Sequence, residues 1–251
     1  MTSEMRLIGL TALPEVTPGM DLAELARAAV RDAGEALRDG DALVVTHKIV
    51  AKAEGRLVDL RAVEPSDFAR EWAAAWGKDP RHIEVVLRES ARIVRMDRGI
   101  LITQTRHGFV CANSGVDASN VPGEEMVCLL PLDPDATARA LHQSLQEATG
   151  AHIAVIIADS FGRPWRNGIV NVAIGAAGLA PLVDYRGQVD DFGRTMQVSV
   201  LAVADELASA AELVMGKVDR CPMALIRGYA YDRREGSASE LLMDPATDMF
   251  R

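Results

Sequence analysis

IAVIIADSFGRPWRNG, residues 153–168, is the stretch that decides how this chain folds. Its first six residues are all apolar and predict a buried strand. The apolar run stops at Asp159 and Ser160, and Gly162, Pro164 and the residues around them predict a loop. The pattern therefore places a carboxylate and a hydroxyl at the edge of a rigid core, where a ligand can reach them.

The polar residues of this stretch suit two kinds of ligand. Asp159 and Ser160 offer the oxygen atoms that Mg²⁺ or Mn²⁺ prefers. Arg163 and Arg166 carry guanidinium groups that match a phosphate or a carboxylate. In the plainer interpretation, Asp159 caps the loop and the arginines are solvated. Because aspartate is common at strand ends, this stretch alone favours the plainer interpretation.

Composition indicates a soluble globular protein. A chain of 251 residues with 49% hydrophobic and 25% charged residues can bury the core of one or two domains. Aromatic residues make up only 4%, so aliphatic side chains must fill that core. The net charge of −9 argues against non-specific binding to nucleic acid or to a membrane surface.

Cysteine usage and the N-terminus point to the cytoplasm. Cys111, Cys128 and Cys221 are far apart and fit no zinc spacing, and their low, odd number suits buried, reduced thiols. The first residues lack the apolar core of a signal peptide, and no apolar run is long enough to cross a bilayer. We therefore expect a cytoplasmic protein without a membrane segment.

The first quarter of the chain alternates strand and helix. Residues 7–10 predict a strand, residues 22–38 an amphipathic helix ended by Gly40, and residues 42–46 a buried strand. The basic segment 47–56, with His47, Lys48 and Lys52, follows that strand directly. Strand ends are where α/β proteins collect ligand groups, so this segment is either a binding segment or a short solvated helix.

The middle of the chain predicts two helices and an antiparallel meander. The helices span residues 66–76 and 80–90, and the strands span 91–96, 99–105 and 108–112, separated by turn residues. The meander leads into residues 113–120, which are almost all small and polar and include Asp117. Such a loop exposes backbone N–H groups and side-chain oxygens, so it is either a phosphate or metal cradle or an ordinary surface loop.

The last part of the chain returns to alternating elements. Strands are expected at 126–130, 168–175 and 223–227, helices at 134–149 and from 204 to 215, and polar loops at 184–194 and 217–222. The pattern Ser237-x-x-Glu240 indicates one more short helix. Because the meander interrupts a simple βαβ alternation, the fold class is α+β (mixed α/β).

Several common functional motifs are absent from the sequence. There is no GxxxxGK[ST] loop, no GxGxxG after the first strand, no HExxH and no GxSxG. What remains is two acids on separate polar segments, Asp117 and Asp159, and the basic cluster of His47, Lys48 and Lys52. Acids that hold a divalent ion beside cations that hold phosphates are typical of phosphoryl transfer.

Four segments, in this order along the chain, carry a resemblance to a known family. They are Lys52-Ala53-Glu54-Gly55-Arg56, Asn113-x-Gly115-x-Asp117-Ala118-Ser119-Asn120, Asp159-Ser160-x-Gly162-Arg163 and Leu213-Val214-Met215-Gly216-Lys217. Together with Leu13-Pro14, they closely resemble the gamma-glutamyl ligases of coenzyme F-420 biosynthesis. The resemblance extends from Leu13 to about Tyr229, which is nearly the whole chain.

This resemblance implies a GTP-dependent ligase that joins L-glutamate to the glutamate-free deazaflavin precursor and then adds further glutamates through γ-linkages. Such enzymes use Mg²⁺ or Mn²⁺, are helped by K⁺, and form intertwined homodimers. Their gamma-glutamyl ligase fold is α+β and has no Walker P-loop. We expect one such unit over residues 1–251, with room for two closely associated subdomains, and no fused nitroreductase-like domain.

The resemblance also implies roles for single residues. Asp117 and Asp159 match metal-binding acids, and Ser160 matches a hydroxyl ligand of the metal. Nucleotide-contacting positions are matched by Leu13, Pro14, Glu15, Val16, His47, Lys48, Lys52 and Asn120, and by the loop Met215, Gly216, Lys217, Val218, Asp219, Arg220, Cys221 and Pro222. His47 and Lys48 depart from the hydroxyl residues of some members.

Lys217 is a larger departure, because archaeal members have an acidic metal ligand at this position. Either the lysine replaces part of the charge of a second metal ion, or Asp219 or a water molecule fills in. We take Asp117 and Asp159 as the catalytic acids, acting in the formation of an acyl phosphate from GTP. Arg163 and Arg166 are assigned to the substrate on their chemistry rather than on the resemblance.

Two rival functions follow from the same residues. One is a ligase of the same fold that acts on another acid acceptor. The other is a non-catalytic GTP-binding subunit, which is favoured if Lys217 prevents productive metal binding.

Overall fold

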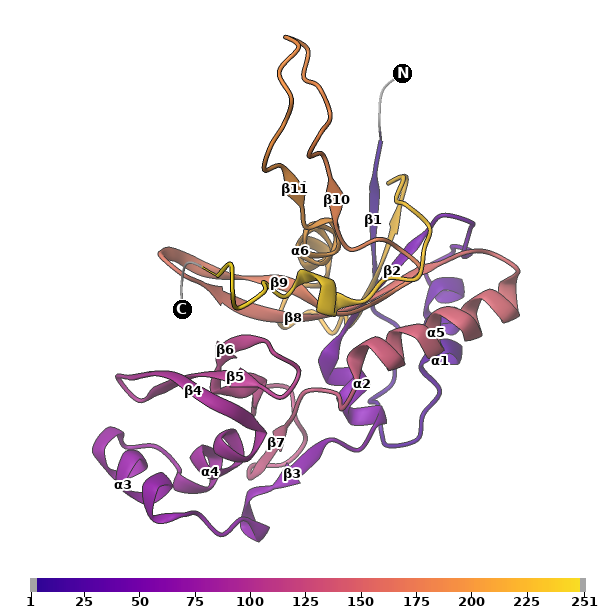
Figure 1. The fold of residues 1–251 in the computed structure, drawn as a ribbon. Coiled ribbons are helices and arrows are strands. Elements are labelled where there is room, and N and C mark those ends of the chain that lie inside the picture. The colour runs from indigo at the N-terminus through magenta and orange to yellow at the C-terminus, as the bar shows by residue number, and fades with distance from the viewer. Residues whose placement is uncertain (1–3, 249–251) are drawn as a thin grey trace.

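A five-stranded mixed sheet is the centre of the protein (Figure 1). The computed structural model describes residues 4–248. The strand order in this sheet is β1 (Arg6–Leu10), β12 (Met223–Arg227), β2 (Ala42–Thr46), β8 (Ala154–Arg163) and β9 (Arg166–Ala177). β2 and β8 run parallel, whereas the other three neighbouring pairs are antiparallel. The mixture of parallel and antiparallel pairs agrees with the predicted α+β class.

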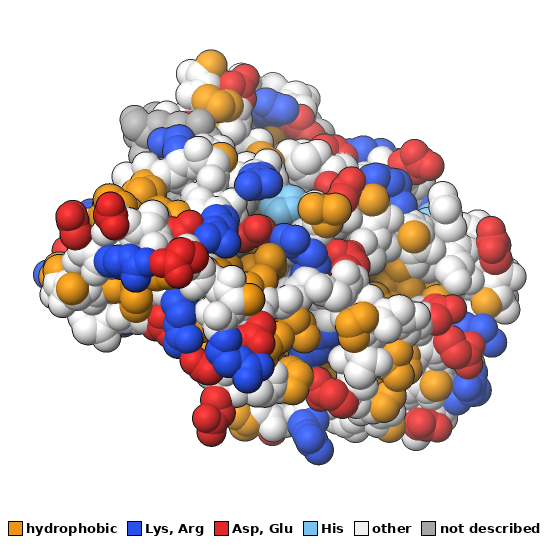
Figure 2. Space-filling view, turned by 90° about the horizontal axis from the view of Figure 1, so that it is seen from below, with side chains coloured by type: hydrophobic (Ala, Val, Ile, Leu, Met, Phe, Trp, Pro, Cys, Tyr) orange, Lys and Arg blue, Asp and Glu red, His pale blue; other side chains and the backbone are white. Residues whose placement is uncertain are grey.

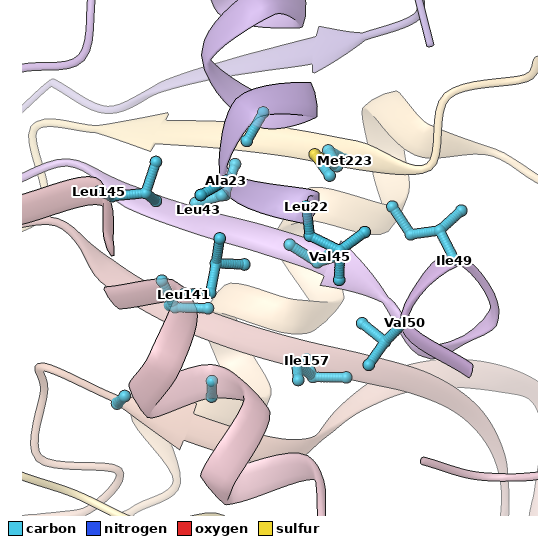
Figure 3. Packing of buried hydrophobic residues seen from close by; sticks show 14 of the residues in the cluster. Leu22, Ala23, Leu43, Val45, Ile49, Val50, Leu141, Leu145, Ile157 and Met223 are labelled. Atoms are coloured by element: carbon cyan, nitrogen blue, oxygen red, sulfur yellow. The ribbon is translucent and has the colours of Figure 1, made fainter. Parts of the chain in front are cut away.

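Helices cover both faces of this sheet, as the continuous apolar sequence of β2 and β8 requires. Leu43 and Val45 belong to the cluster on one face, where α1 (Leu22–Asp32) and α5 (Pro134–Thr149) pack (Figure 3). Val44 and Ile156 belong to the cluster on the other face, against α6 (Val203–Met215). Successive side chains of a strand point to opposite faces, so the two clusters alternate along the sequence.

The helix predicted for residues 22–38 is shorter than expected. Asp21 caps the start of α1 through hydrogen bonds from the backbone N–H groups of Ala23 and Glu24, but the helix ends at Asp32 rather than Arg38. Gly34 adopts φ = 73° and donates its N–H to the carbonyl of Arg31, which turns the chain out of the helix. The helix α5, by contrast, has the predicted bounds, and Gly150 follows it in a left-handed conformation.

A smaller lobe carries the predicted meander. Strands β4 (Ser90–Asp97), β5 (Ile100–Thr105) and β6 (Val110–Ala112) pair antiparallel in this order, which confirms that prediction. The helices α3 (Asp67–Trp76) and α4 (Pro80–Glu89) and the antiparallel pair β3 (Leu57–Asp59) and β7 (Met126–Cys128) complete the lobe. It has a hydrophobic cluster of its own, with Val86 and Leu101 at its centre.

The loop predicted after Ala158 is instead a continuation of strand β8. This strand runs on to Arg163, a tight turn follows at Pro164 and Trp165, and β9 starts at Arg166. β2 ends at Thr46, opposite Ala158, so from Asp159 onward β8 is paired only with β9. A two-stranded ribbon tolerates polar side chains on both faces, and for this reason the end of the apolar run did not mark the end of the strand.

The remaining elements are short. β10 (Val183–Asp184) and β11 (Val200–Leu201) form the base of an extended arm, which stands at the top of Figure 1 where a polar loop was predicted. The 3₁₀ helices are η1 (Leu60–Ala62), η2 (Asn113–Gly115) and η3 (Ala238–Leu241). Ser237 and Glu240 form the predicted capping box at η3.

The cysteines agree with the prediction of buried thiols. All three cysteines are buried and free. Seen from below Figure 1, acidic and basic side chains are interspersed over the face that Figure 2 shows, rather than gathered into a surface of one sign. Within residues 4–248, no helix is long and apolar enough to span a membrane.

The central strands give a stability prediction. Ile157 is fully buried in β8, so Ile157→Ala removes apolar contacts and leaves a cavity, and we expect a loss of about 2–5 kcal/mol in the free energy of unfolding. Ile169→Ala in β9 is the matched control, because Ile169 is 55% exposed, and it should change this free energy by less than about 0.5 kcal/mol. Urea unfolding of both variants measures the difference, and equal losses would contradict the assigned core.

Candidate active site

The parallel pairing of β2 with β8 brings two distant segments together. Thr46 lies opposite Ala158 in the register, so both strands end their pairing at the same edge of the sheet. From Thr46 the chain enters α2 (His47–Ala53), and from Ala158 it continues to Asp159 and Ser160. A register shift between β8 and β9 falls at Ile157 and Ala158, and such bulges re-aim side chains next to functional sites.

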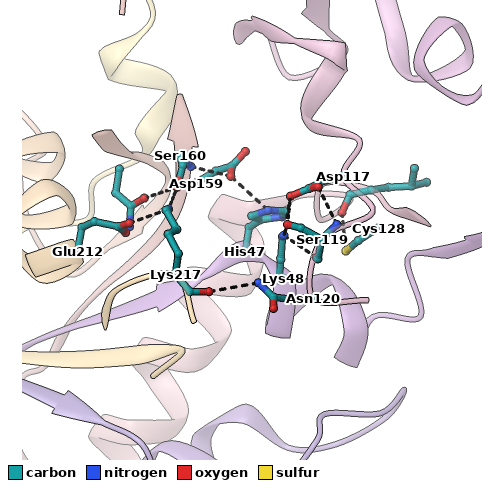
Figure 4. Close-up of polar contacts among 12 residues, drawn as sticks. His47, Lys48, Asp117, Ser119, Asn120, Cys128, Asp159, Ser160, Glu212 and Lys217 are labelled. Carbon is teal, nitrogen blue, oxygen red and sulfur yellow. Dashed lines mark hydrogen bonds and ion pairs between the residues drawn. The ribbon is translucent and has the colours of Figure 1, made fainter. Parts of the chain in front are cut away.

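The carboxylate of Asp159 lies against His47. His47 Nε2 is 3.2 Å from Asp159 Oδ1, which also accepts a hydrogen bond from the backbone N–H of Ser160 at 2.6 Å (Figure 4). Among the described residues none donates a hydrogen bond to Asp159 Oδ2. The side chain of His47 is only 2% exposed, and its Nδ1 is buried without a partner. In this structure His47 therefore supports the carboxylate of Asp159, and its expected contact with the nucleotide stays a prediction.

Lys48, which follows His47 in α2, holds the carboxylate of Asp117. Lys48 Nζ donates to Asp117 Oδ2 at 2.6 Å, and also to the backbone carbonyl and the hydroxyl of Ser119. The loop that carries Asp117 is anchored to β7, because the backbone N–H and C=O groups of Asp117 pair with those of Cys128. Burial raises the pKa of Asp117, but the hydrogen bonds from Lys48 and Ser119 outweigh it, so the pKa lies below its ordinary value.

Lys52 ties the N-terminal segment of residues 13–16 to helix α2. Its buried ammonium group donates to Glu15 Oε1, and Leu13 and Val16 pack into the core cluster on either side of that residue. Residues 13–16 therefore lie beside α2, as a shared binding site requires.

The loop Met215 to Pro222 reaches the site from α6. Asn120 Nδ2 donates to the carbonyl of Lys217 at 3.5 Å, and the ammonium group of Lys217 donates to Ser160 Oγ. The same ammonium lies 2.6 Å from Glu212 Oε1. The loop thus closes the site between the segment around Asn120 and the strand β8, while Cys221 packs inward.

The charged side chains of this region also affect the buried thiol of Cys128. Burial raises its pKa to about 11, Lys48 and Lys52 lower it, and Asp117 and Asp159 raise it. Four charged side chains from three separate segments act on this single sulfur atom. Because His47 and Lys48 are consecutive residues of α2, their contacts bring Asp159 and Asp117 to the same end of this helix.

Two residues of the site escaped sequence analysis. Glu212 lies in the apolar helix α6 and contacts Lys217, and Asn171 lies within strand β9 and accepts a hydrogen bond from Ser160 Oγ at 2.6 Å. The spacing of an acid five residues before a lysine, with Gly216 between them, was the available signal for Glu212.

Arg163 and Arg166 stand apart from this cluster. They are paired at the tip of the β8–β9 hairpin, and a guanidinium nitrogen of Arg163 donates to the carbonyl of Asn167. Arg163 is four residues beyond Asp159, which corresponds to about 13 Å along an extended strand.

Comparison with known proteins identifies the family. The family model for F420-0:gamma-glutamyl ligase matches residues 11–228. The chain belongs to the F420-0:gamma-glutamyl ligase family. Proteins named coenzyme F420:L-glutamate ligase from Methanothermobacter thermautotrophicus and Methanopyrus kandleri are 46% and 47% identical, over 98% and 94% of both chains. A protein of the same name from Methanocaldococcus jannaschii is 41% identical over 86% of both chains.

The gamma-glutamyl ligase site has donors of the kind that Mg²⁺ or Mn²⁺ takes. Within residues 4–248, no group of three or more His, Cys, Asp or Glu side chains converges so as to hold a metal ion. Asp117 and Asp159 nevertheless provide two carboxylates, and Mg²⁺ is commonly bound by one or two carboxylates with substrate phosphates and water. The two acids therefore suit a cation that takes its remaining ligands from water and from a substrate.

The Lys48–Asp117 pair predicts a pH dependence. Because its folded pKa is lowered, ionised Asp117 stabilises the fold above its ordinary pKa of 3.8, and this stability is lost as the pH falls through the lower folded pKa. Lys48→Met removes the donor, so the folded pKa of Asp117 should rise toward its ordinary value and the contribution of ionised Asp117 to stability should shrink. Carboxyl ¹³C NMR titration measures this, with Lys78→Met as the distant control; an unchanged Asp117 pKa would contradict the pairing.

Proposed function

We propose that this protein is a GTP-dependent ligase that joins L-glutamate to the glutamate-free deazaflavin precursor of coenzyme F-420. The names of the relatives and their near full-length alignment support the reaction. A single observation carries the proposal. His47 and Lys48, the first two residues of α2, contact Asp159 and Asp117, which lie on two other segments of the chain. This arrangement suits phosphoryl transfer, and the GTP requirement rests on the family resemblance.

In the first step, a carboxylate oxygen of the precursor attacks the γ-phosphorus of GTP. The new carboxylate O–P bond forms as the bond to the bridging β,γ-oxygen breaks, so GDP leaves and an acyl phosphate remains. In the second step, the amine of L-glutamate attacks the acyl carbon, a C–N bond forms, inorganic phosphate leaves and the amine loses a proton. Repetition on the added glutamate gives the γ-linked chain.

Charge balance explains why a cation must accompany the nucleotide. The ammonium groups of Lys48, Lys52 and Lys217 are paired with the carboxylates of Asp117, Glu15 and Glu212, and a fourth carboxylate, that of Asp159, lies beside His47. A triphosphate adds further negative charge to a site in which carboxylates already outnumber ammonium groups. Asp117 and Asp159 would hold a divalent cation that stabilises the charge developing on the transferred phosphoryl group.

The chain's own cations have distinct roles in this proposal. Lys52, buried beside residues 13–16, neutralises a phosphate as a point charge. Lys48 exchanges its contact with Asp117 for a phosphate oxygen when the metal ion binds. His47 keeps Asp159 Oδ1 occupied, so that Oδ2 is directed to the ligand.

We assign binding of the acceptor, the deazaflavin precursor, to the tip of the β8–β9 hairpin. Arg163 and Arg166 offer two guanidinium groups to the phosphate or carboxylate of the precursor, beyond the strand that carries Asp159. In keeping with the family resemblance, we also propose stimulation by K⁺, a homodimer and a cytoplasmic location.

Substitution of the two acids tests the catalytic assignment. Asp159→Asn and Asp117→Asn should each lower turnover on the order of 10³-fold, because each removes a charge that holds the cation in the transition state. Asp97→Asn, on the exposed end of β4, is the control and should retain wild-type turnover. Mass spectrometry of products from GTP, Mn²⁺, L-glutamate and the deazaflavin precursor gives the readout.

The same assay separates the rival functions. Near-normal turnover in Asp159→Asn would disprove the metal assignment. Turnover of GTP only with a different acid acceptor would identify a ligase of another specificity. Tight GTP binding without turnover on any acceptor would identify a non-catalytic nucleotide-binding subunit.

The assignment of the hairpin tip gives a separate kinetic prediction. Arg166→Ala should raise the KM for the precursor by about 10-fold or more, since a hydrogen bond to a charged group is worth about 1.5–3 kcal/mol. The KM for GTP should stay unchanged, because the nucleotide residues lie elsewhere. Arg95→Ala, on β4, is the matched control. An equal rise in both KM values, or no rise for the precursor, would refute the assignment.

A further inference from the structure

The ammonium group of Lys217 occupies an unusual position in the site. It donates to Ser160 Oγ and lies 2.6 Å from Glu212 Oε1 (Figure 4). Ser160 is next to Asp159, and its own hydroxyl hydrogen is donated to Asn171 Oδ1 at 2.6 Å. The hydroxyl therefore turns a lone pair, rather than its hydrogen, toward the lysine.

Backbone geometry fixes the lysine in this place. Gly216 ends α6 with φ = 59° and ψ = −166°, a combination that is essentially restricted to glycine. A Cβ at Gly216 would lie 2.0 Å from Asp219 Oδ2, so a side chain here would have to displace the carboxylate of Asp219 as well as adopt this backbone conformation. The turn sends Lys217 back over the end of the helix, where Glu212 lies five residues earlier.

The partners of this ammonium group are those of a bound cation. A hydroxyl lone pair and a carboxylate oxygen are the ligands that Mg²⁺ or Mn²⁺ would take at this point. Lysine has three N–H donors, and Ser160 and Glu212 account for two of them. The third remains for an anionic oxygen of a substrate that enters beside Asp159.

We propose that Lys217, positioned by Glu212, is a built-in cation of the site. It takes the place of a metal ion on the side of Ser160, and its third N–H contacts an oxygen of the nucleotide triphosphate. This inference rests on the proposed function for the identity of that anion. Ser160 then serves the lysine instead of a metal, and the site takes its divalent cation at Asp117 and Asp159 alone.

Counting bound Mn²⁺ tests this inference without turnover. Electron paramagnetic resonance of free Mn²⁺, in the presence of guanosine 5′-[β,γ-imido]triphosphate, gives the number of ions bound per chain. Lys217→Ala frees Ser160 and Glu212, so it should bind one Mn²⁺ more per chain than the wild-type protein. Lys217→Met, which keeps the aliphatic stem, is the second variant, and Lys78→Ala should match the wild type. Equal numbers in the wild type and both Lys217 variants would overturn the inference.

Chemical rescue tests the same inference through activity. Propylammonium replaces the atoms that Lys217→Ala removes, so it should restore turnover in that variant, whereas tetramethylammonium, which has no N–H donor, should not. Glu212→Ala should raise the KM for GTP more than it lowers kcat, and Glu212→Gln, which keeps an oxygen acceptor, should recover most of the loss. Rescue by neither amine, or by both equally, would count against a positioned ammonium group.

The outcomes separate this inference from the proposed function. If the wild-type protein makes no glutamylated deazaflavin but the Mn²⁺ numbers differ as expected, the reaction is wrong and the built-in cation stands. If the wild type makes that product and the Mn²⁺ numbers are equal, the ligase stands and the built-in cation is refuted.

Discussion

The parallel pairing of β2 with β8 is the constraint on which the site depends. Both strands are buried on both faces, so their register is fixed by packing against α1 and α5 on one side and α6 on the other. Parallel strands end at the same edge, and this puts the start of α2 beside Asp159, more than a hundred residues away in sequence. A slip in this register would separate the basic helix from the acid.

The site holds its charges as pairs before any ligand binds. Burying a polar or charged group without a partner is costly, and the basic side chains of α2 are the more buried members of each pair: His47 lies beside Asp159, Lys48 beside Asp117 and Lys52 beside Glu15. The three basic residues occupy one short helix, whereas the acids come from three separate segments. In the proposed function, a phosphate of the nucleotide would therefore exchange places with carboxylates around a fixed row of basic side chains.

The sequence predicted most elements because their signals are local. Ser66 and Gly77 mark the ends of α3, and Gly150 follows α5. The failures involve information that lies elsewhere in the chain. The strand β8 continues beyond Ala158 because β9 pairs with it, and the apolar run could not reveal that partner. Glu212 joins the site only because Gly216 folds the loop back, so its role depends on a conformation and not on its own sequence pattern.

The position of Lys217 also bears on how the family can vary. In the arrangement that we propose, Lys217 is a tethered cation in place of a diffusible metal ion, and such a cation would be present at every metal concentration and would need no entry step. This exchange requires that the neighbouring groups accept hydrogen bonds from the lysine. Here Asn171 orients the hydroxyl of Ser160, and Glu212 supplies the carboxylate. The proposed role of Lys217 thus depends on two residues outside the loop Met215 to Pro222, namely Asn171 in β9 and Glu212 in α6. The chemistry of this loop is therefore tied to the packing of α6 against β9.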